Sequence, residues 1–273
     1  EFKNPCWAKD EQWHSIRMLC WDGKQWHPLE SQIYNLEYID STHVKKCNIV
    51  FLIPEIANGE ERYFVYYDNN AKSKPNYVDH VSIEDSYYYY EPISGVSVEG
   101  DYYKIIEDGY VVYGIGQKGK AINRWFSQVV LKQKPETKEF SLLNSDTLAS
   151  FGFSYHAGPT DDYERSSDQK LISKDITIDG NLMIEFKIVS ESNDGNLRTT
   201  NSYRYYYCPT DIKRISVHVK HHVINPVKVS GLLNADGRYA ALFSFKSTSE
   251  KLEKMRFGEI LPYLHIVGED GSI

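Results

Sequence analysis

Apolar residues recur at every second position along much of the chain, in short segments separated by turn signals. Each signal pairs Asp or Asn with Gly, and these pairs stand at 22–23, 58–59, 108–109, 179–180, 194–195, 236–237 and 270–271. Such a pair between alternating apolar residues is the strongest short-range signal for a β-hairpin. The pattern therefore predicts a protein of many antiparallel strands.

The segments between these turns show the period of two that is typical of half-buried strands. The apolar face of the longest segment consists of Ile215, Val217, Val219 and Val223. His221 interrupts this face, where we expect a buried histidine bonded to a backbone carbonyl. The expected strands are 48–54, 62–68, 110–116, 181–190, 203–208, 214–224 and 239–245.

Helical signals are few. Residues 247–260 open with Ser and Thr, which favour a helix start, and fit one or two turns. Residues 120–132 fit a helix or a strand, and β-branched Val129 and Val130 favour the strand. We therefore expect an all-β fold of the sandwich type.

A polar stretch at 69–80 divides the chain, because it contains Pro75 and has no apolar periodicity. We expect a small N-terminal β-sandwich at 1–72. A larger antiparallel β-sandwich, with two broad stacked sheets, is expected at 80–273.

The composition excludes two classes of partner. The net charge is −7 with a sequence pI of about 5.7, and lysines and arginines form no basic stripe, so nucleic acid is not expected. No stretch approaches the ~20 apolar residues of a membrane-spanning helix, so no membrane span is expected in this chain.

Tyrosine is abundant, with 22 residues, and two segments are especially rich in it. In the run 87–90, a strand would send Tyr88 and Tyr90 to one face and the other two rings to the opposite face. Segment 203–207 repeats the pattern. Buried phenol hydroxyls need partners, so we expect one face of these strands in a core and the other to be an aromatic surface. A sugar-binding surface and a subunit interface would look alike here.

Two stretches resemble parts of known families. The segments 22-DGKQWHPLESQ-32, 50-VFLIPEIANG-59 and 63-YFVYYD-68 resemble the small N-terminal β-sandwich of some secreted carbohydrate-active proteins. The segment 197-LRTTNSYRYYYCPTDIKRISVHVKHHV-223 is similar to the paired strands of galactose-mutarotase-like supersandwiches, as found in several polysaccharide lyases. The resemblance implies a secreted or cell-surface protein, a polysaccharide partner and lyase-like activity on acidic glycans.

A lyase must neutralise a uronate carboxylate and remove the C5 proton, and His, Tyr and arginine suit these tasks. The candidate catalytic residues are His156, His218 and Tyr205. The candidate substrate-binding residues are Arg198, Arg204, Lys220, His222, Tyr88 and Tyr90. The alternatives for the same residues are a solvated sheet face, a polar turn and aromatic pairs between strands.

No cofactor or metal site is expected, although Asp161 and Asp162 offer ligands for structural calcium in a loop without EF-hand spacing. The same two-part layout also resembles cell-surface proteins whose sandwiches are structural. The alternative function is therefore a surface-layer or filament subunit that self-assembles through tyrosine-rich faces.

The four cysteines form no CxxC pair, which excludes a zinc ribbon and a thioredoxin motif. They allow two disulfides in three connectivities, or four buried thiols. The secreted character implied by the resemblance favours disulfides.

Overall fold

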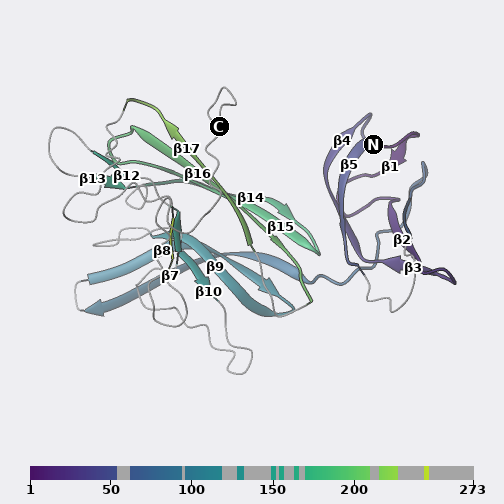
Figure 1. Ribbon diagram of the computed structural model, residues 1–273, viewed down its shortest axis with the longest axis horizontal. Coiled ribbons are helices and arrows are strands. Elements are labelled where there is room, and N and C mark those ends of the chain that lie inside the picture. Colours follow the sequence, from purple (N-terminus) through teal and green to yellow (C-terminus); the bar gives the residue numbers. More distant parts are fainter. Residues whose placement is uncertain are drawn as a thin grey trace. The chain divides into compact units, whose positions relative to one another are not determined.

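The computed structural model is all-β throughout the part of the chain that it describes (Figure 1). It describes residues 1–53, 62–93, 96–118, 128–131, 149–151, 154–156, 163–165, 170–209, 215–226 and 243–245, with side chains at 1–53, 62–86, 103–109, 170–209 and 215–226. Within these ranges there is no helix, and the strands form several antiparallel sheets. The predicted fold class is confirmed.

Each strand expected from the alternation is present in part or in full. They are β5 (His43–Phe51), β6 (Arg62–Tyr66), β9 (Tyr110–Lys118), β15 (Met183–Glu191), β16 (Leu197–Tyr206), β17 (Ile215–Val223) and β18 (Phe243–Phe245). The strand favoured within 120–132 is found as β10 (Gln128–Leu131). The helix expected at 247–260 lies outside the described residues.

By its internal contacts the chain divides into two compact units. The first comprises Glu1–Ser82 together with Ile176–Glu185 and Arg204–Ser216. The second comprises Ile83–Asp175, Phe186–Tyr203 and Val217–Ile273. The continuous part of the first unit thus ends just after the polar stretch 69–80, and parts of four later strands also belong to this unit.

The first unit contains two three-stranded sheets. One has the order β1 (Cys6–Trp7), β5, β4 (Ser31–Tyr38), and the other has the order β3 (Trp26–Leu29), β2 (Arg17–Trp21), β6. Ile49 of β5 packs against the buried residues of both sheets, so the two sheets share a core as in a sandwich. The buried residues are Cys6, Ala8, Ile16, Ile33 and Val44 from one cluster and Met18, Cys20 and Leu29 from the other.

The second unit contains strands of two four-stranded sheets. Their orders are β10-β9-β8-β7, with β7 (Val81–Ile93) and β8 (Val96–Glu107), and β14-β15-β16-β17, with β14 (Lys170–Asp179). Tyr103 of β8 meets Phe186 of β15 edge-on, with ring centroids 5.1 Å apart, and Phe186 stacks on Tyr203 at 4.9 Å. These rings form part of the core between the two sheets. Two short pairs complete the described strands, β11 (Ala149–Phe151) with β18 and β12 (Ser154–His156) with β13 (Tyr163–Arg165).

The turn signals act as predicted at 108–109. Asp108 and Gly109 have φ of 48° and 82°, and the hairpin closes with Glu107 opposite Tyr110. Positive φ at both central residues is the requirement of a type I′ hairpin turn, which Asp-Gly meets at little steric cost.

Within the first unit, the side chain of Gln32 binds the turn between β14 and β15 to β4. The Gln32 side-chain oxygen accepts hydrogen bonds from the backbone N–H of Leu182 and Met183 at 2.9 and 2.7 Å, and its Nε2 donates to the Met183 carbonyl at 3.0 Å. Gln32 is 5% exposed, so these bonds are shielded from water. A Cβ on Gly180 would overlap the Gln32 carboxamide. Only glycine therefore leaves room for this contact.

This contact predicts strong coupling between Gln32 and Gly180. Gln32→Ala leaves two backbone N–H groups unpaired and should cost about 2–4 kcal/mol of unfolding free energy. Gly180→Ala alone should cost about 1–3 kcal/mol by overpacking. The double variant should be more stable than the sum of the two losses predicts, because truncating Gln32 makes room for the new methyl group. Urea unfolding of the four proteins measures this cycle, and strict additivity would contradict the contact.

The expected disulfides are absent from the structure, in which each of the four cysteines carries a thiol. Cys6 and Cys20 are fully buried in the two core clusters of the first unit, where they pack as small apolar side chains. Cys47 packs against the first of these clusters. The disulfide prediction was wrong because it depended on an assumed compartment and not on the positions of the strands.

Alkylation tests this correction. Burial raises the pKa of the Cys6 thiol and raises the pKa of Cys47 to about 12, so both thiols resist alkylation in the folded protein. Iodoacetamide added in denaturant without reductant should attach to all four cysteines, as read by mass. Fewer adducts, restored by a reductant, would show a disulfide.

Candidate functional site

The first unit contains a pocket of about 210 Å³ with mainly polar walls. Four segments far apart in the sequence form it: the turn before β2, the start of β4, the stretch 74–79 and the turn after β14. The lining residues are Glu11, Gln12, His14, Ser31, Gln32, Ile33, Lys74, Pro75, Tyr77, Asp79, Asp179, Gly180 and Asn181.

The turn that carries Glu11, Gln12 and His14 is fixed by its own backbone. The Asp10 carboxylate accepts from the backbone N–H of Gln12 at 2.9 Å and of Trp13 at 2.7 Å. Such a carboxylate is a common way to order a turn. The turn closes where Lys9 N–H donates to the Trp13 carbonyl at 2.8 Å.

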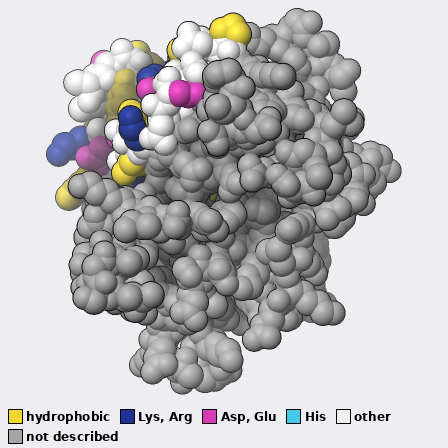
Figure 2. All heavy atoms as spheres, turned by 90° about the vertical axis from the view of Figure 1, so that its left-hand side faces the viewer, with side chains coloured by type: hydrophobic (Ala, Val, Ile, Leu, Met, Phe, Trp, Pro, Cys, Tyr) yellow, Lys and Arg dark blue, Asp and Glu magenta, His cyan; other side chains and the backbone are white. Residues whose placement is uncertain are grey.

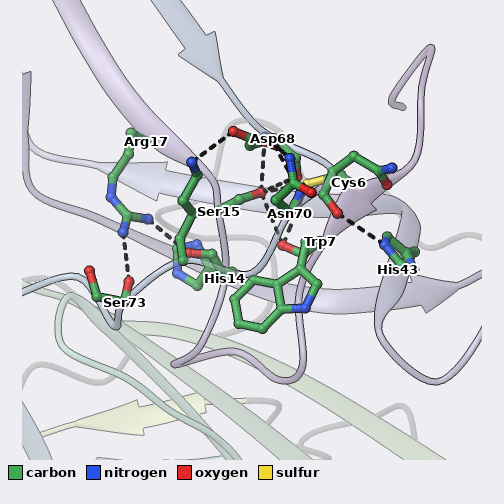
Figure 3. A network of polar contacts seen from close by, with 11 residues as sticks. Cys6, Trp7, His14, Ser15, Arg17, His43, Asp68, Asn70 and Ser73 are labelled. Atoms are coloured by element: carbon green, nitrogen blue, oxygen red, sulfur yellow. Dashed lines mark hydrogen bonds and ion pairs between the residues drawn. The ribbon is translucent and has the colours of Figure 1, made fainter.

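Arg17 ties this turn to the polar stretch after β6 (Figure 3). One of its terminal nitrogens donates to the carbonyls of His14 and Ile16 at 2.8 and 2.7 Å, and the other donates to the Ser73 carbonyl at 2.9 Å. Nearby, Ser15 Oγ lies 2.7 Å from the Asp68 carbonyl and accepts from the Asp68 N–H at 3.1 Å. Two walls of the pocket are therefore joined by charge-assisted and partly buried hydrogen bonds.

His14 is the most buried titratable group of the pocket, with 2% of its surface exposed. Burial, reinforced by the charge of Arg17, lowers its pKa to about 4, so the imidazole is neutral at pH 7. Its Nδ1 is buried and has no hydrogen-bond partner among the described residues.

The carboxylates of the pocket also have shifted pKa values. Burial raises the pKa of Glu11, with a smaller contribution from the charge of Asp10. Burial and then the charge of Asp79 raise the pKa of Asp179. Lys74 Nζ donates to Gln12 Oε1 at 2.8 Å, so these two lining residues are joined by a hydrogen bond.

A second candidate site is the outer face of the sheet β3-β2-β6. On the central strand β2, Trp21 pairs with Trp26 of β3 and with Arg62 of β6. Leu19 of β2 pairs with Phe64 of β6. Because paired residues share a face, these side chains lie opposite the core residues Met18 and Cys20. We call the aromatic side chains of this outer face the aromatic face; they are Trp21, Trp26, Phe64 and Tyr66.

Three of these rings, Trp21, Trp26 and Phe64, are in contact, and Trp26, Phe64 and Tyr66 are exposed to solvent. The Trp21 and Trp26 centroids are 5.1 Å apart, and Trp26 meets Phe64 edge-on at 5.0 Å. Trp26 is 51% exposed, Phe64 45% and Tyr66 55%. Contiguous exposed rings on a sheet mark a binding surface more often than chance, since water contact with them is unfavourable.

The residues expected from the sequence are distributed over both units. Arg204 and Tyr205 belong to the first, and Arg198, His218, Lys220, His222, Tyr88, Tyr90 and His156 belong to the second. Tyr205 is fully buried. Tyr88 and Tyr90 lie on β7, and His156 lies on β12 opposite Tyr163, but their side chains are outside the described part of the chain.

Both arginines bind a carboxylate of their own chain. Arg198 donates through Nε and Nη2 to Glu191 Oε2 at 3.0 and 2.6 Å. Arg204 Nε donates to Glu185 Oε2 at 2.7 Å. In this structure each guanidinium therefore already has the carboxylate partner that a uronate would otherwise supply.

The polar face of β17 is exposed as the alternation predicts. His218, Lys220 and His222 are exposed, and the residues between them are half-buried. His221 lies on the half-buried face, and burial lowers its pKa to about 4. Its Nδ1 is 3.0 Å from the Thr199 hydroxyl.

Among the described side chains visible on the face in Figure 2, basic, acidic and apolar groups are interspersed. Within the described ranges, no three His, Cys, Asp or Glu side chains converge as metal ligands. No helix in those ranges has the length and apolarity needed to cross a membrane.

Comparisons with protein-family models, with curated proteins and with solved structures find no match. The lyase-like family therefore remains an expectation from strand patterns, and function must be argued from the two sites.

Sequence reasoning missed both sites for different reasons. The pocket is formed by contacts between residues far apart in the sequence. No local sequence pattern predicts that His14 and Asn181 both line it. The sequence does contain a signal for the aromatic face, because Trp21 and Trp26 flank a Gly-containing turn of suitable hairpin length. The sequence prediction placed the aromatic surface on the tyrosine-rich strands instead.

The shifted pKa of His14 predicts acid sensitivity of the first unit. The folded protein holds His14 neutral down to about pH 4, whereas in the unfolded chain the imidazole binds a proton near its ordinary pKa of 6.5. Stability is therefore unaffected above pH 6.5 and falls as the pH drops toward 4, by roughly 3 kcal/mol in full. His14→Gln should flatten this pH dependence.

Urea unfolding at neutral and acidic pH, followed by tryptophan fluorescence, measures the effect, because Trp7, Trp13, Trp21 and Trp26 all lie in the first unit. His221→Gln is the matched control, since His221 has a similarly lowered pKa but lies in the second unit. An equal pH dependence in wild type and His14→Gln would contradict the assignment.

Proposed function

We propose that the protein is a glycan-binding β-sandwich protein that binds its ligand on the aromatic face of the sheet β3-β2-β6. The observation that carries this proposal is the contact of Trp21, Trp26 and Phe64 on a solvent-exposed sheet surface. The proposed ligand is the carbohydrate that the sequence resemblance suggested. The proposed binding surface lies in the first unit, whereas most of the residues expected from the sequence lie in the second.

The chemistry of sugars suits this surface. One side of a pyranose ring presents C–H groups, which pack on an aromatic ring with the burial of apolar area, while the hydroxyls stay in water. A β-sheet holds its side chains at fixed spacing, so a row of rings is preorganised and loses little entropy on binding. Indole has the largest ring area of any side chain, which makes Trp26 the expected anchor.

The described residues support binding more than lyase catalysis. Tyr205 is buried, and Arg198 and Arg204 are held by Glu191 and Glu185. A binding role needs none of these groups. A cell-surface or extracellular location is part of this proposal, since that is where a binding protein meets polysaccharide.

Substitution of single rings tests the proposal. Trp26→Ala and Phe64→Ala should each weaken polysaccharide binding by about tenfold or more, equivalent to ~1.4 kcal/mol. Isothermal titration against a panel of neutral and acidic polysaccharides gives the affinities. Trp13→Ala is the matched control, because Trp13 is 44% exposed in the same unit but lies outside the aromatic face.

The results separate binding from self-assembly. Loss of polysaccharide binding in Trp26→Ala, with Trp13→Ala unchanged, supports a glycan site. The absence of binding to every polysaccharide, together with a wild-type oligomer that Trp26→Ala converts to monomer in sedimentation, would replace the proposal with a subunit contact.

A further inference from the structure

The polar pocket of the first unit shares no residue with the aromatic face, so its function is a separate question. All thirteen lining residues belong to the first unit, which makes the pocket a feature of one compact body. The glycan proposal does not use it.

The walls of the pocket are acidic. Glu11, Asp79 and Asp179 bring three carboxylates, and Lys74 brings one ammonium, which leaves a formal charge of −2 with His14 neutral. Burial and then the charge of Asp79 raise the pKa of Asp179, so these two carboxylates lie close enough to repel each other. A positive group placed between them would relieve this repulsion.

His14 adds a buried ring nitrogen to the wall of the pocket. Its Nδ1 has no hydrogen-bond partner in the described part of the chain. A ring nitrogen of a neutral imidazole either donates or accepts, and a ligand hydroxyl can do both. A buried polar atom without a partner costs free energy, and such a hydroxyl would satisfy it.

Asn181 adds a donor on the opposite strand turn. Its Nδ2 is buried and has no partner among the described residues. The position of Asn181 is fixed, because its carbonyl accepts from the His80 N–H at 3.0 Å and the adjacent residues are bound by Gln32. A ligand that satisfies both sites must therefore carry an acceptor such as a hydroxyl as well as a cationic donor.

The size of the pocket limits the ligand. A volume of about 210 Å³ is below that of sites for drug-sized molecules and holds the equivalent of about seven waters. A bare metal ion is disfavoured because no three ligands of the described residues converge at metal distance. The class of ligand that fits this size and these polar groups is a small organic cation with hydroxyl groups.

We propose that this pocket binds a small hydroxylated primary amine of the size and chemistry of an amino sugar. The ammonium group lies beside Asp79 and Asp179, one ligand hydroxyl bonds His14 Nδ1, and a second ligand hydroxyl accepts from Asn181 Nδ2.

Three sugars that differ at one position test this inference on the full chain. Glucosamine carries the ammonium, N-acetylglucosamine replaces it with an uncharged amide, and glucose replaces it with a hydroxyl. Isothermal titration at pH 7 should show glucosamine binding at least about tenfold more tightly than either of the other two. Equal binding of all three, or no binding of glucosamine, would overturn the proposal.

Two substitutions locate the binding. Asp179→Asn removes one carboxylate of the pair and should weaken glucosamine binding about fivefold or more, with the preference over glucose reduced. Asp175→Asn, on the same strand but outside the pocket, should leave binding unchanged. If Asp179→Asn lowers thermal stability, Asp79→Asn serves in its place.

The aromatic face is tested at the same time. Trp26→Ala should leave glucosamine affinity unchanged, because the ring lies outside the pocket. Loss of glucosamine binding in Trp26→Ala, with Asp179→Asn unchanged, would place the amine on the aromatic face and overturn the pocket assignment.

Discussion

The first unit depends on one buried side chain, Gln32. Its carboxamide satisfies two backbone N–H groups and one carbonyl of the turn between β14 and β15, more than 140 residues away in the sequence. A side-chain amide that mimics a strand edge in this way joins the chain's late hairpin to its first sheet. The small size of Gly180 is what lets the carboxamide approach.

Further contacts reinforce the same junction. His80 N–H donates to the Asn181 carbonyl, and the Tyr207 N–H donates to the Leu182 carbonyl at 2.8 Å. The His80 ring stacks on Tyr207 at 4.1 Å between centroids, and its Nε2 bonds Glu30 at 2.8 Å. The turn thus has almost no freedom, which explains how Asp179 and Asn181 can form a rigid wall of the pocket.

Much of the fold was predictable because it follows from local rules. Period-two alternation predicted β17 and its exposed polar face, and Asp108-Gly109 predicted a hairpin whose φ values require that pair. The return of 176–185 and 204–216 to the first unit was not predictable, since it depends on Gln32, whose sequence neighbourhood is an ordinary strand.

The sites were harder to predict than the strands for the same reason. Arg198 and Arg204 suggested anion binding as isolated residues, and only the structure shows Glu191 and Glu185 beside them. Tyr205 fell on the core face of its strand and not on the surface, a choice that alternation alone leaves open. The exposed rings of Trp26 and Phe64 become a surface only through strand order, because β3 and β6 both flank β2.

The most direct test of glycan binding at the aromatic face is hydrogen exchange of the full chain, with and without the polysaccharide that it binds most tightly. Binding at the aromatic face predicts slower exchange confined to β2, β3 and β6. Protection on the polar face of β17, around His218 and Lys220, with β2, β3 and β6 unchanged, would contradict the account and return the glycan to the second unit.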